Sequence, residues 1–454
     1  MAGLKVSVSG IRGIWGDGLD IETLSGFLKA FIIFLKGRNC SRVLIGRDAR
    51  PTGQMIANLA AGILNAYGID VWDCGIVPTP TILFGVRKLS LGGGIIISAS
   101  HNPVEWNALK FVIKDGIFPG EEDVRLINSF IGAPLHENAY DSIGTYEFNP
   151  EIEEMHISEI LNKVSQSKIR ERKFRVVLDP VNSAGGRIGK NLLERLGCEV
   201  LLVNGEINGT FGRGPEPTPS NLTHLTPAVR QFRADAGFAQ DPDADRLVCI
   251  DETGRVLSEE MTFALCADHI LSGRKGDIVI NLSTSMVNEW IAEKHGVRCH
   301  RTKVGEANVT AGIFSHKALI GGEGNGGVIY PEINCARDSL VGMALILEMM
   351  ALENRPLSEA ADSLPHYFMS KEKVETSLSP DIIFGRIKKE FDGAGIDQTD
   401  GLRLEWNDKG GKIWLHIRAS NTEPVFRIIG ESGDEDLLKG SLERVREILS
   451  RPAV

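Results

Sequence analysis

The sequence predicts an α/β protein with three similar α/β domains on mixed, mostly parallel sheets, plus a smaller C-terminal α+β domain. The first observation is a strand, a polar turn, a helix and a second strand, in that order, at residues 42–75. The same order returns at 174–203 and at 277–299. Because strands that alternate with helices form parallel sheets covered by helices, each stretch predicts one α/β unit. The second observation is a change of pattern after about residue 365.

The first unit shows the pattern most clearly. A short apolar run (RVLIG) precedes a polar turn (RDARPTG), a helical stretch (QMIANLAAGILNAYG) and another apolar run (IDVWDCG). Short apolar runs bounded by turn residues predict strands. The three units share almost no residue identity, so they indicate similar domains rather than a strict sequence repeat.

The C-terminal part has a different order of elements. A helical stretch near 379–392 precedes the strand-like runs LRLEW, GKIWLHIRAS and VFRIIGE, and a charged helix ends the chain. A tight DKGG turn joins the first two of these runs, which predicts antiparallel pairing. The last domain is therefore expected to be α+β.

The length of 454 residues fits several domains at roughly 100–200 residues each. Candidate linkers contain glycine, asparagine or proline and lie at 143–150, 251–254 and 355–365. The expected domains are therefore 1–150, 151–252, 253–364 and 365–454.

Composition excludes several classes of protein. The chain has 50 Lys+Arg and 60 Asp+Glu, a formal net charge of −10, which argues against a protein that coats nucleic acid. The longest apolar runs, such as 31–35, are far shorter than the ~20 residues of a membrane span, and the N-terminus lacks a secretory signal. The seven cysteines are scattered without a CxxC pair, which indicates neither a disulfide framework nor a zinc knuckle. We expect a cytoplasmic protein with reduced thiols, no nucleic-acid partner and no membrane span.

A serine-containing loop follows a buried strand within residues 92–111 (GGGIIISASHNPVEWNALKF). Parallel α/β sheets bind ligands at the carboxyl ends of their strands, so Ser100 is a candidate nucleophile or phosphate carrier. Alternatively, Ser98 and Ser100 cap the next turn. A serine hydrolase fits poorly, because the G-x-S-x-G elbow is absent and adjacency alone does not place His101 as a base.

A second loop (DPDADR) concentrates three carboxylates at alternate positions: Asp241, Asp243 and Asp245. Such charges repel one another unless a cation lies among them, which predicts a divalent metal site. A calcium EF-hand is disfavoured, because Arg246 stands where that loop needs glycine and residues 247–250 resemble a strand. The alternative is a solvated acidic turn. Arg246 suits a phosphate-bearing site, since a guanidinium can hold phosphate oxygens bidentately.

Two further loops are rich in ligand-binding groups. The glycine-rich stretch 319–332 (LIGGEGNGGVIYPE) presents Glu323 and Asn325, an acceptor and a donor suited to sugar hydroxyls, although a plain turn is an alternative and no Walker motif is present. The stretch 418–428 (RASNTEPVFRI) predicts an anion site, with a salt-bridged turn as the alternative. The donors of this second stretch are Arg418, Ser420, Asn421, Thr422 and Arg427.

Taken together, the motifs SASHNP, DPDADR, GEGNGG and RASNTEP resemble, in order and over essentially the whole chain, the α-D-phosphohexomutase superfamily. Its members interconvert sugar 1-phosphates and 6-phosphates and include phosphoglucosamine mutases, phosphomannomutases and phosphoglucomutases. Three shorter stretches match as well: SGIRG with Arg12, GRDARPTG with Arg47, and TKVGEANV with Lys303. The resemblance implies four domains around a central cleft.

The resemblance also implies a role for each matching residue. Ser100 would carry the phosphoryl group, and its phosphoserine oxygen would bind Mg²⁺ together with Asp241, Asp243 and Asp245. The groups around the transferring phosphate would be Arg12, His101, Lys110 and Arg246. The substrate would be held by Lys303, Glu323, Asn325, Arg418, Ser420, Asn421, Thr422 and Arg427. A hexose 1,6-bisphosphate would serve as intermediate and activator, sugar phosphates would be the partners, and the chain would be a monomer or homodimer.

The chain departs from the family pattern in its sugar loop and nearby. Many relatives end that loop in a histidine, where this chain has Gly326 and Gly327, and Glu306 stands where some relatives have another histidine. These departures leave Lys110 as the preferred acid/base candidate. Asn325 replaces a common serine, which leaves the sugar open among glucosamine, mannose and glucose phosphates. The combination of DPDADR, GEGNGG and RASNTEP resembles prokaryotic phosphoglucosamine and phosphomannomutase relatives more than the longer phosphoglucomutases. The resemblance therefore implies glucosamine phosphate as the substrate, with dual mannose and glucose phosphate specificity as the alternative. Hypotheses of other classes are a non-catalytic sugar-phosphate sensor and a metal-dependent phosphatase.

Overall fold

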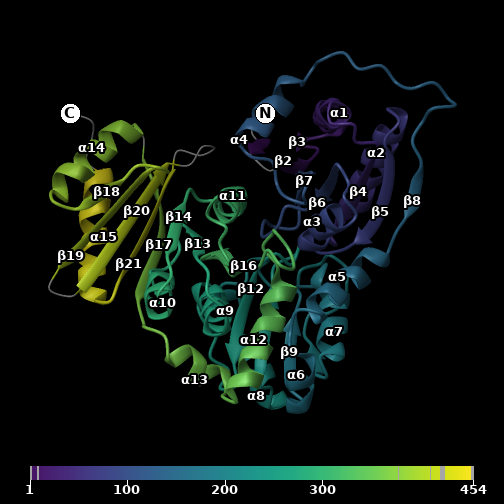
Figure 1. The fold of residues 1–454 in the computed structure, drawn as a ribbon. Helices are drawn as coiled ribbons and strands as arrows, with labels where there is room; N and C mark the ends of the chain where they lie inside the picture. The colour runs from purple at the N-terminus through teal and green to yellow at the C-terminus, as the bar shows by residue number, and fades with distance from the viewer. Residues whose placement is uncertain (1–2, 8–9, 377, 409–410, 420–424, 451–454) are drawn as a thin grey trace.

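The computed structural model describes residues 3–7, 10–376, 378–408, 411–419 and 425–450, and it confirms the predicted fold class. Four separate sheets follow one another along the chain, and each lies within one of the four predicted ranges. Figure 1 shows the domains in an arc, with the first and fourth domains at its two ends and the second and third between them.

The first domain contains an eight-stranded mixed sheet, ordered β1-β2-β7-β6-β4-β5-β8, with β3 beside β2. Hydrophobic clusters lie on both faces of this sheet: α1, α2 and α4 pack on one face and α3 on the other. The elements are β1 (Lys5–Ser7), β2 (Gly10–Trp15), β3 (Gly18–Leu19), α1 (Ile21–Lys36), β4 (Arg42–Arg47), α2 (Gly53–Ala66), β5 (Asp70–Ile76), α3 (Thr79–Lys88), β6 (Gly93–Ile97), β7 (Trp106–Ile113), α4 (Glu121–Ser129) and β8 (Tyr146–Phe148).

Helix α1 illustrates how local sequence sets an element. Asp20 caps it, because its side chain accepts a hydrogen bond from the backbone N–H of Thr23 at 2.8 Å. Leu24, Leu28 and Phe31 recur at helical spacing and are fully buried. Removing such an apolar stripe from water supplies most of the stability of a surface helix.

The second and third domains repeat the central topology of the first. In each, a strand pairs in parallel with two neighbours, and the third strand of the unit pairs antiparallel with a fourth, giving β10-β9-β11-β12 and β14-β13-β15-β16. The same arrangement in the first domain is β5-β4-β6-β7. The three predicted α/β units are therefore one recurring unit, although they share little sequence.

The second domain runs from α5 (Glu151–Leu161) to β12. Its elements are α5, α6 (Gln166–Arg172), β9 (Arg175–Asp179), α7 (Gly185–Arg195), β10 (Glu199–Leu202), a 3₁₀ turn (Pro219–Asn221), α8 (Leu225–Phe232), β11 (Ala236–Gln240) and β12 (Leu247–Asp251). The third domain begins at α9. Its elements are α9 (Glu259–Gly273), β13 (Ile278–Asn281), α10 (Val287–His295), β14 (Cys299–Thr302), α11 (Glu306–His316), β15 (Ile320–Glu323), β16 (Gly327–Ile329), α12 (Ser339–Glu353) and α13 (Leu357–Asp362).

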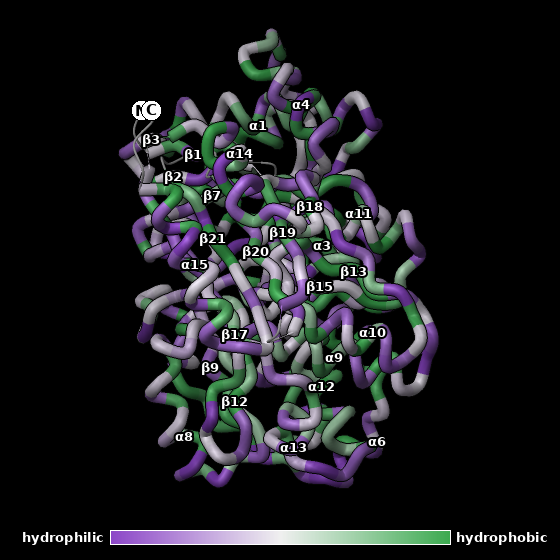
Figure 2. Tube along the Cα trace, turned by 90° about the vertical axis from the view of Figure 1, so that its left-hand side faces the viewer, coloured by the Kyte–Doolittle hydropathy of each residue, from purple (hydrophilic) through white to green (hydrophobic). Residues whose placement is uncertain are grey.

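Helix α12 joins these two domains into one core. It is apolar around most of its circumference, as expected for a helix buried on all sides. A single hydrophobic cluster includes Phe238 of β11, Phe263 of α9 and Leu345 of α12. In Figure 2, hydrophobic segments are common inside the outline and hydrophilic segments along its edge. The middle of the arc is thus a continuous packed body.

The fourth domain is an antiparallel five-stranded sheet with two helices, as the sequence predicts. The strand order is β17-β21-β20-β19-β18. Its elements are β17 (Phe368–Glu375), α14 (Pro380–Glu390), β18 (Gly395–Asp397), β19 (Leu402–Asp408), β20 (Gly411–Ala419), β21 (Val425–Ser432) and α15 (Glu435–Ser450). None of the seven cysteines forms a disulfide. Within the described residues, every helix is too short or too polar to cross a bilayer.

Candidate active site

Three of the chemistry-bearing loops occupy the same position in three copies of one unit. The serine loop joins β6 to β7, the aspartate loop joins β11 to β12, and the glycine-rich loop joins β15 to β16. In each unit the loop is the connection between the third strand and its antiparallel neighbour. The arc turns these three connections toward one another, so motifs far apart in sequence form one site.

The serine loop holds Ser100 in a conformation that few residues adopt. Its φ is 50°, in the left-handed region, where a non-glycine residue is uncommon and marks a position held by its surroundings. The N–H of Ser100 donates to Ser98 Oγ at 2.9 Å, and that hydroxyl donates to Asp48 Oδ2 at 2.6 Å. Ser98 therefore supports the backbone at Ser100, as its capping role predicts.

Arg50 stabilises the serine loop through hydrogen bonds to its backbone carbonyls. Its guanidinium is buried, pairs with Asp48 at 2.9 Å, and donates to the carbonyls of Ser100 and Asn102 at 2.6 and 2.7 Å. In the GRDARPTG motif, Arg50 thus contacts the serine loop, whereas Arg47 donates to Gln54 on α2. The sequence alone does not reveal which arginine of the motif reaches the site.

The aspartate triad lies directly opposite Ser100. Ser100 Oγ donates to Asp241 Oδ2 at 2.8 Å, and Lys110 Nζ contacts Asp243 Oδ2 at 2.6 Å. One ligand oxygen from each aspartate lies within 4.8 Å of the others, and all three residues are fully buried. Ala244, between the second and third aspartates, has φ 53°, a turn that brings alternate carboxylates to one side.

The triad fits a hard divalent cation. Burial and the neighbouring charges of Asp245 and Asp243 raise the pKa of Asp241 well above its ordinary value. Among the described residues, Asp243 Oδ1 and Asp245 Oδ1 are buried without a hydrogen-bond partner. Buried carboxylate oxygens that repel one another and lack donors form a suitable ligand set for Mg²⁺. The triad could therefore hold a metal ion.

Cationic and imidazole groups surround Ser100. Arg12 Nη1 donates to Asn102 Oδ1 at 2.6 Å, and Arg246 Nη1 donates to Glu216 Oε1 at 3.1 Å. The positive charge of Arg246, together with burial, lowers the pKa of His101 to about 2, so this ring is neutral at physiological pH. Its Nδ1 lies 3.4 Å from Ser100 Oγ. The predicted phosphate-contacting groups are thus brought together.

The sugar-loop carboxylate Glu323 lies at the end of β15. Its Oε1 accepts hydrogen bonds from Asn281 Nδ2 at 2.8 Å and from the N–H of Gly305 at 3.0 Å. Burial opposes its ionisation, but the positive charge of Arg337, the hydrogen bonds from Asn281 and Gly305 and the charge of Arg246 together hold the pKa of Glu323 below its ordinary value. Asn325 Nδ2 is 3.4 Å from Glu323 Oε2. The loop therefore presents a charged acceptor beside an amide.

The fourth domain contributes two arginines from β20 and β21. Arg418 Nε donates to Asp400 Oδ1 at 3.0 Å, and Arg418 and Arg427 both line a cavity shared with His101 and Glu323. The predicted Ser420, Asn421 and Thr422 lie outside the described residues. Lys303 is not among the residues that line this cavity; its Nζ pairs with Glu121 of α4 at 2.9 Å, which links the third domain to the first.

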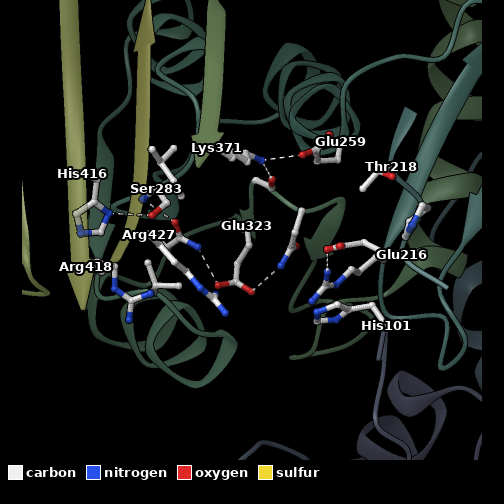
Figure 3. Close-up of a pocket in the computed structure, with 17 residues that line it drawn as sticks. His101, Glu216, Thr218, Glu259, Ser283, Glu323, Lys371, His416, Arg418 and Arg427 are labelled. Carbon is white, nitrogen blue, oxygen red and sulfur yellow. Dashed lines mark hydrogen bonds and ion pairs between the residues drawn. The ribbon is translucent and has the colours of Figure 1, made fainter. Parts of the chain in front are cut away.

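Two adjoining cavities connect these groups. One, of about 240 Å³, is lined by residues of all four domains, including His101, Arg246, Glu323 and Arg418. The other, of about 300 Å³, reaches Ser100 and is also lined by Arg246 and Glu323. In Figure 3, Glu323 lies centrally, with Arg418 and His416 on one side and His101 on the other. The cleft can therefore accommodate a small molecule with an anionic group at each end.

Sequence reasoning missed two further cations at this site. Lys371 of β17 donates to the carbonyl of Gly324 in the sugar loop at 2.9 Å and pairs with Glu260 at the same distance. Arg337, at the start of α12, contacts Asp245, Glu306 and Glu323. No local pattern indicates either residue, because their partners are distant in sequence.

Comparisons with known proteins agree with this geometry. Four models of phosphoglucomutase/phosphomannomutase domains match in order: α/β/α domain I at 3–134, domain II at 154–254, domain III at 258–368 and the C-terminal domain at 372–448. A phosphoglucomutase/phosphomannomutase of Thermococcus kodakarensis is 36% identical over 441 residues, which cover 96% of each chain. A phosphoglucosamine/phosphogalactosamine mutase of Sulfurisphaera tokodaii is 31% identical, covering 98% of this chain and 99% of that one.

A solved structure agrees as well. The phosphoglucomutase/phosphomannomutase family protein of Burkholderia thailandensis superposes with a TM-score of 0.84 at 25% identity over 98% of both chains. The fold and these relatives define a mutase that transfers phosphoryl groups, an enzyme of the isomerase class. The chain belongs to the α-D-phosphohexomutase superfamily.

Proposed function

We propose that this enzyme interconverts hexose 1-phosphate and hexose 6-phosphate through a phosphorylated Ser100, with glucosamine phosphate as its best substrate. The observation that carries this proposal is the position of Ser100 Oγ, 2.8 Å from the aspartate triad and at the wall of a cavity that also contains Glu323. A phosphoryl group on this oxygen would lie between the carboxylate cluster and the bound sugar.

The reaction consists of two transfers. In the first, the bond between phosphorus and Ser100 Oγ breaks while a bond to the free sugar hydroxyl forms; the hydroxyl proton passes to a base, and Ser100 Oγ takes up a proton. This step yields a hexose 1,6-bisphosphate and unmodified serine. After the bisphosphate turns over in the cleft, its other phosphoryl group passes to Ser100 Oγ, which loses its proton, and the sugar oxygen released from phosphorus takes up a proton. Neither transfer consumes water.

The chain's own residues supply positioning and charge. Arg12, His101 and Arg246 surround the phosphoryl group, and Lys110 is the preferred acid/base because it enters the same cavity from β7. The Mg²⁺ ion that the three aspartates would hold neutralises charge on the phosphoryl oxygens. Phosphoryl transfer depends mainly on such positioning and electrostatic stabilisation. We also propose the domain boundaries predicted from the sequence and a cytoplasmic location.

The substrate argument concerns the sugar 2-position. Glu323 as an acceptor suits the 3- and 4-hydroxyl region, and neither Glu323 nor Asn325 is assigned to the 2-substituent. If no polar group of the site contacts this substituent, replacing a hydroxyl by an amine costs little binding free energy. Strong discrimination arises only when the wrong substituent leaves buried polar groups of the site unpaired. Each of the two relatives carries a double name, phosphoglucomutase/phosphomannomutase and phosphoglucosamine/phosphogalactosamine mutase, which supports a tolerant enzyme.

We expect kcat/KM values for glucosamine, glucose and mannose 1-phosphates to lie within roughly two to three decades, about 3–4 kcal/mol. Each sugar is assayed side by side with saturating Mg²⁺ and its matching bisphosphate. Preference for one non-amino sugar by more than about four decades would contradict the proposal that the 2-position is unread. Stoichiometric release of inorganic phosphate would instead indicate a phosphatase, and binding without turnover a sensor.

The Arg418→Ala variant tests whether both phosphates visit the fourth domain. Removing a guanidinium that lines the substrate cavity should raise KM for both the 1-phosphate and the 6-phosphate by about tenfold or more. Arg446→Ala is the matched control, because Arg446 is exposed and pairs with Glu372 instead of facing the cavity. If KM rises for only one isomer, the two phosphates do not take turns at Arg418 of the fourth domain.

A further inference from the structure

A buried arginine links the aspartate loop to the sugar loop. The guanidinium of Arg337 contacts three carboxylates through its three nitrogens: Nη2 reaches Asp245 Oδ2 at 2.5 Å, Nη1 reaches Glu323 Oε2 at 2.9 Å, and Nε reaches Glu306 Oε2 at 3.0 Å. The side chain of Arg337 is 11% exposed and forms part of the wall of the cavity at Ser100. Asp245 belongs to the metal-binding triad, whereas Glu323 belongs to the sugar loop.

The contact geometry fixes the spacing of these two loops. A guanidinium is planar and rigid, so two carboxylates bound to its two terminal nitrogens are held in a set relation. The other oxygen of Glu323 is held by Asn281 and Gly305. Arg337 occupies Asp245 Oδ2, whereas Asp245 Oδ1 accepts no hydrogen bond, lies 3.7 Å from Arg246 Nε and is left for a metal cation.

Glycine at position 327 leaves room for this side chain. A Cβ atom added to Gly327 would lie 2.3 Å from Arg337 Cδ and 2.7 Å from its Cγ, closer than real contacts allow. The backbone of Gly327 belongs to strand β16 and lies outside the left-handed region, so its conformation alone does not require glycine. Its lack of a side chain is therefore explained by Arg337, with a further contact of 3.0 Å to Asn325 Oδ1.

Glu306 anchors the arginine at the opposite end. Its Oε1 accepts the backbone N–H of Arg337 at 3.0 Å, while its Oε2 binds the guanidinium. Glu306 and Gly327 both fit Arg337, because this side chain needs an acid at the first position and empty space at the second.

The start of α12 places Arg337 with little freedom. Asp338 caps the helix through the N–H of Leu340 at 3.0 Å, and its other oxygen lies 2.9 Å from His156 of α5. Ser339 Oγ donates to the carbonyl of Ala244 in the aspartate loop at 2.6 Å. Arg337 and Ser339, on either side of Asp338, thus both attach the aspartate loop to the start of this helix.

We propose that Arg337 is a positioning residue of the phosphoryl-transfer site, which holds the sugar-reading carboxylate Glu323 in register with the aspartate triad, and that Gly327 and Glu306 accommodate it. This inference rests on the proposed function. Because the arginine sets the relation between two loops instead of binding the substrate phosphate, its loss should lower kcat more than it changes KM.

The first test compares Arg337→Met with Arg337→Lys. We expect kcat to fall about 10²-fold in the methionine variant while KM changes less than about threefold, with partial recovery in the lysine variant, which keeps the charge but cannot span the carboxylates. Mg²⁺ binding to the protein, measured by calorimetry without sugar, should be unchanged or tighter, because a cation that competes for Asp245 has been removed. A purely structural defect would weaken Mg²⁺ binding together with thermal stability.

The second test is a double-mutant cycle with Gly327→Ala. Alone, this substitution should displace Arg337 and lower kcat by about tenfold or more, whereas in the Arg337→Met background it should cost less than about threefold more. Gly26→Ala on α1 controls for the added methyl group, since open space surrounds that glycine, and Arg403→Met controls for loss of a buried arginine, since Arg403 pairs with Glu405 in the fourth domain.

The outcomes separate this inference from the proposed function. Wild-type kcat and KM in Arg337→Met, weaker Mg²⁺ binding, or fully additive losses in the cycle would overturn the role of Arg337. If Arg337→Met does not fold, the lysine variant and Gly327→Ala carry the same comparison. Absence of mutase activity in the wild type would instead overturn the proposed function, and it would leave the Mg²⁺ measurements interpretable.

Discussion

Replacement of Ser100 by alanine is expected to lower mutase turnover at least 10²-fold while leaving sugar-phosphate binding nearly intact. The physical reason is that this oxygen lies where the aspartate triad and the cavity meet. Ser100 Oγ contacts Asp241 at 2.8 Å, the ring of His101 lies 3.4 Å away, and the strained backbone at Ser100 is held by Ser98 and Arg50. Without the oxygen no covalent carrier exists, although the binding groups of the third and fourth domains remain.

Mass spectrometry and kinetics check this expectation together. Intact wild-type protein should contain a species about 80 Da heavier than the sequence mass, the increment of one phosphoryl group, and the alanine variant should lack it. Ser129→Ala, at an exposed position on α4, is the matched control. Retention of more than about a tenth of wild-type turnover in Ser100→Ala would exclude the carrier role.

The fold could be predicted from sequence because its signals are local. The unit predicted at 42–75 is β4, α2 and β5, and those at 174–203 and 277–299 match strand-helix-strand units of the second and third domains. Most of these strands are short apolar runs bounded by polar turns, so neighbouring residues suffice to predict them; β14, with the sequence CHRT, is an exception. The antiparallel pairing of β2 with β7 could not be found in this way, because it joins Arg12 to Ala108 across most of a domain.

The site was predictable where a loop carries its own chemistry. Asp241, Asp243 and Asp245 repel one another within one turn, so their sequence alone implies a cation. Arg50 and Arg337 give no such signal, because the carbonyls and carboxylates that they contact are distant in sequence. Lys303 shows the converse: a motif match predicted a substrate contact, whereas its ammonium pairs with Glu121. Its substrate role remains a prediction.

Chelation of divalent ions should lower turnover at least 10²-fold and leave the fold intact. Activity depends on the cation because three buried carboxylates face the reacting oxygen, and only part of their charge is balanced by protein groups. Stability should change little, since Lys110 and Arg337 already contact Asp243 and Asp245 at 2.6 and 2.5 Å. Protein cations thus partly substitute for the metal electrostatically, although none of them donates a hydrogen bond to Asp243 Oδ1 or Asp245 Oδ1.

The measurement pairs exhaustive EDTA dialysis with a kinetic assay and a thermal melt. Mg²⁺ added back should restore turnover, and EDTA saturated with Mg²⁺ beforehand is the control for effects of the chelator itself. Because the available ligands are hard carboxylate oxygens, Mn²⁺ should also support activity, whereas a soft metal should not. Full turnover after complete removal of divalent ions would contradict the metal assignment. A collapse of thermal stability on chelation would show that Lys110 and Arg337 do not balance the triad as their contacts indicate.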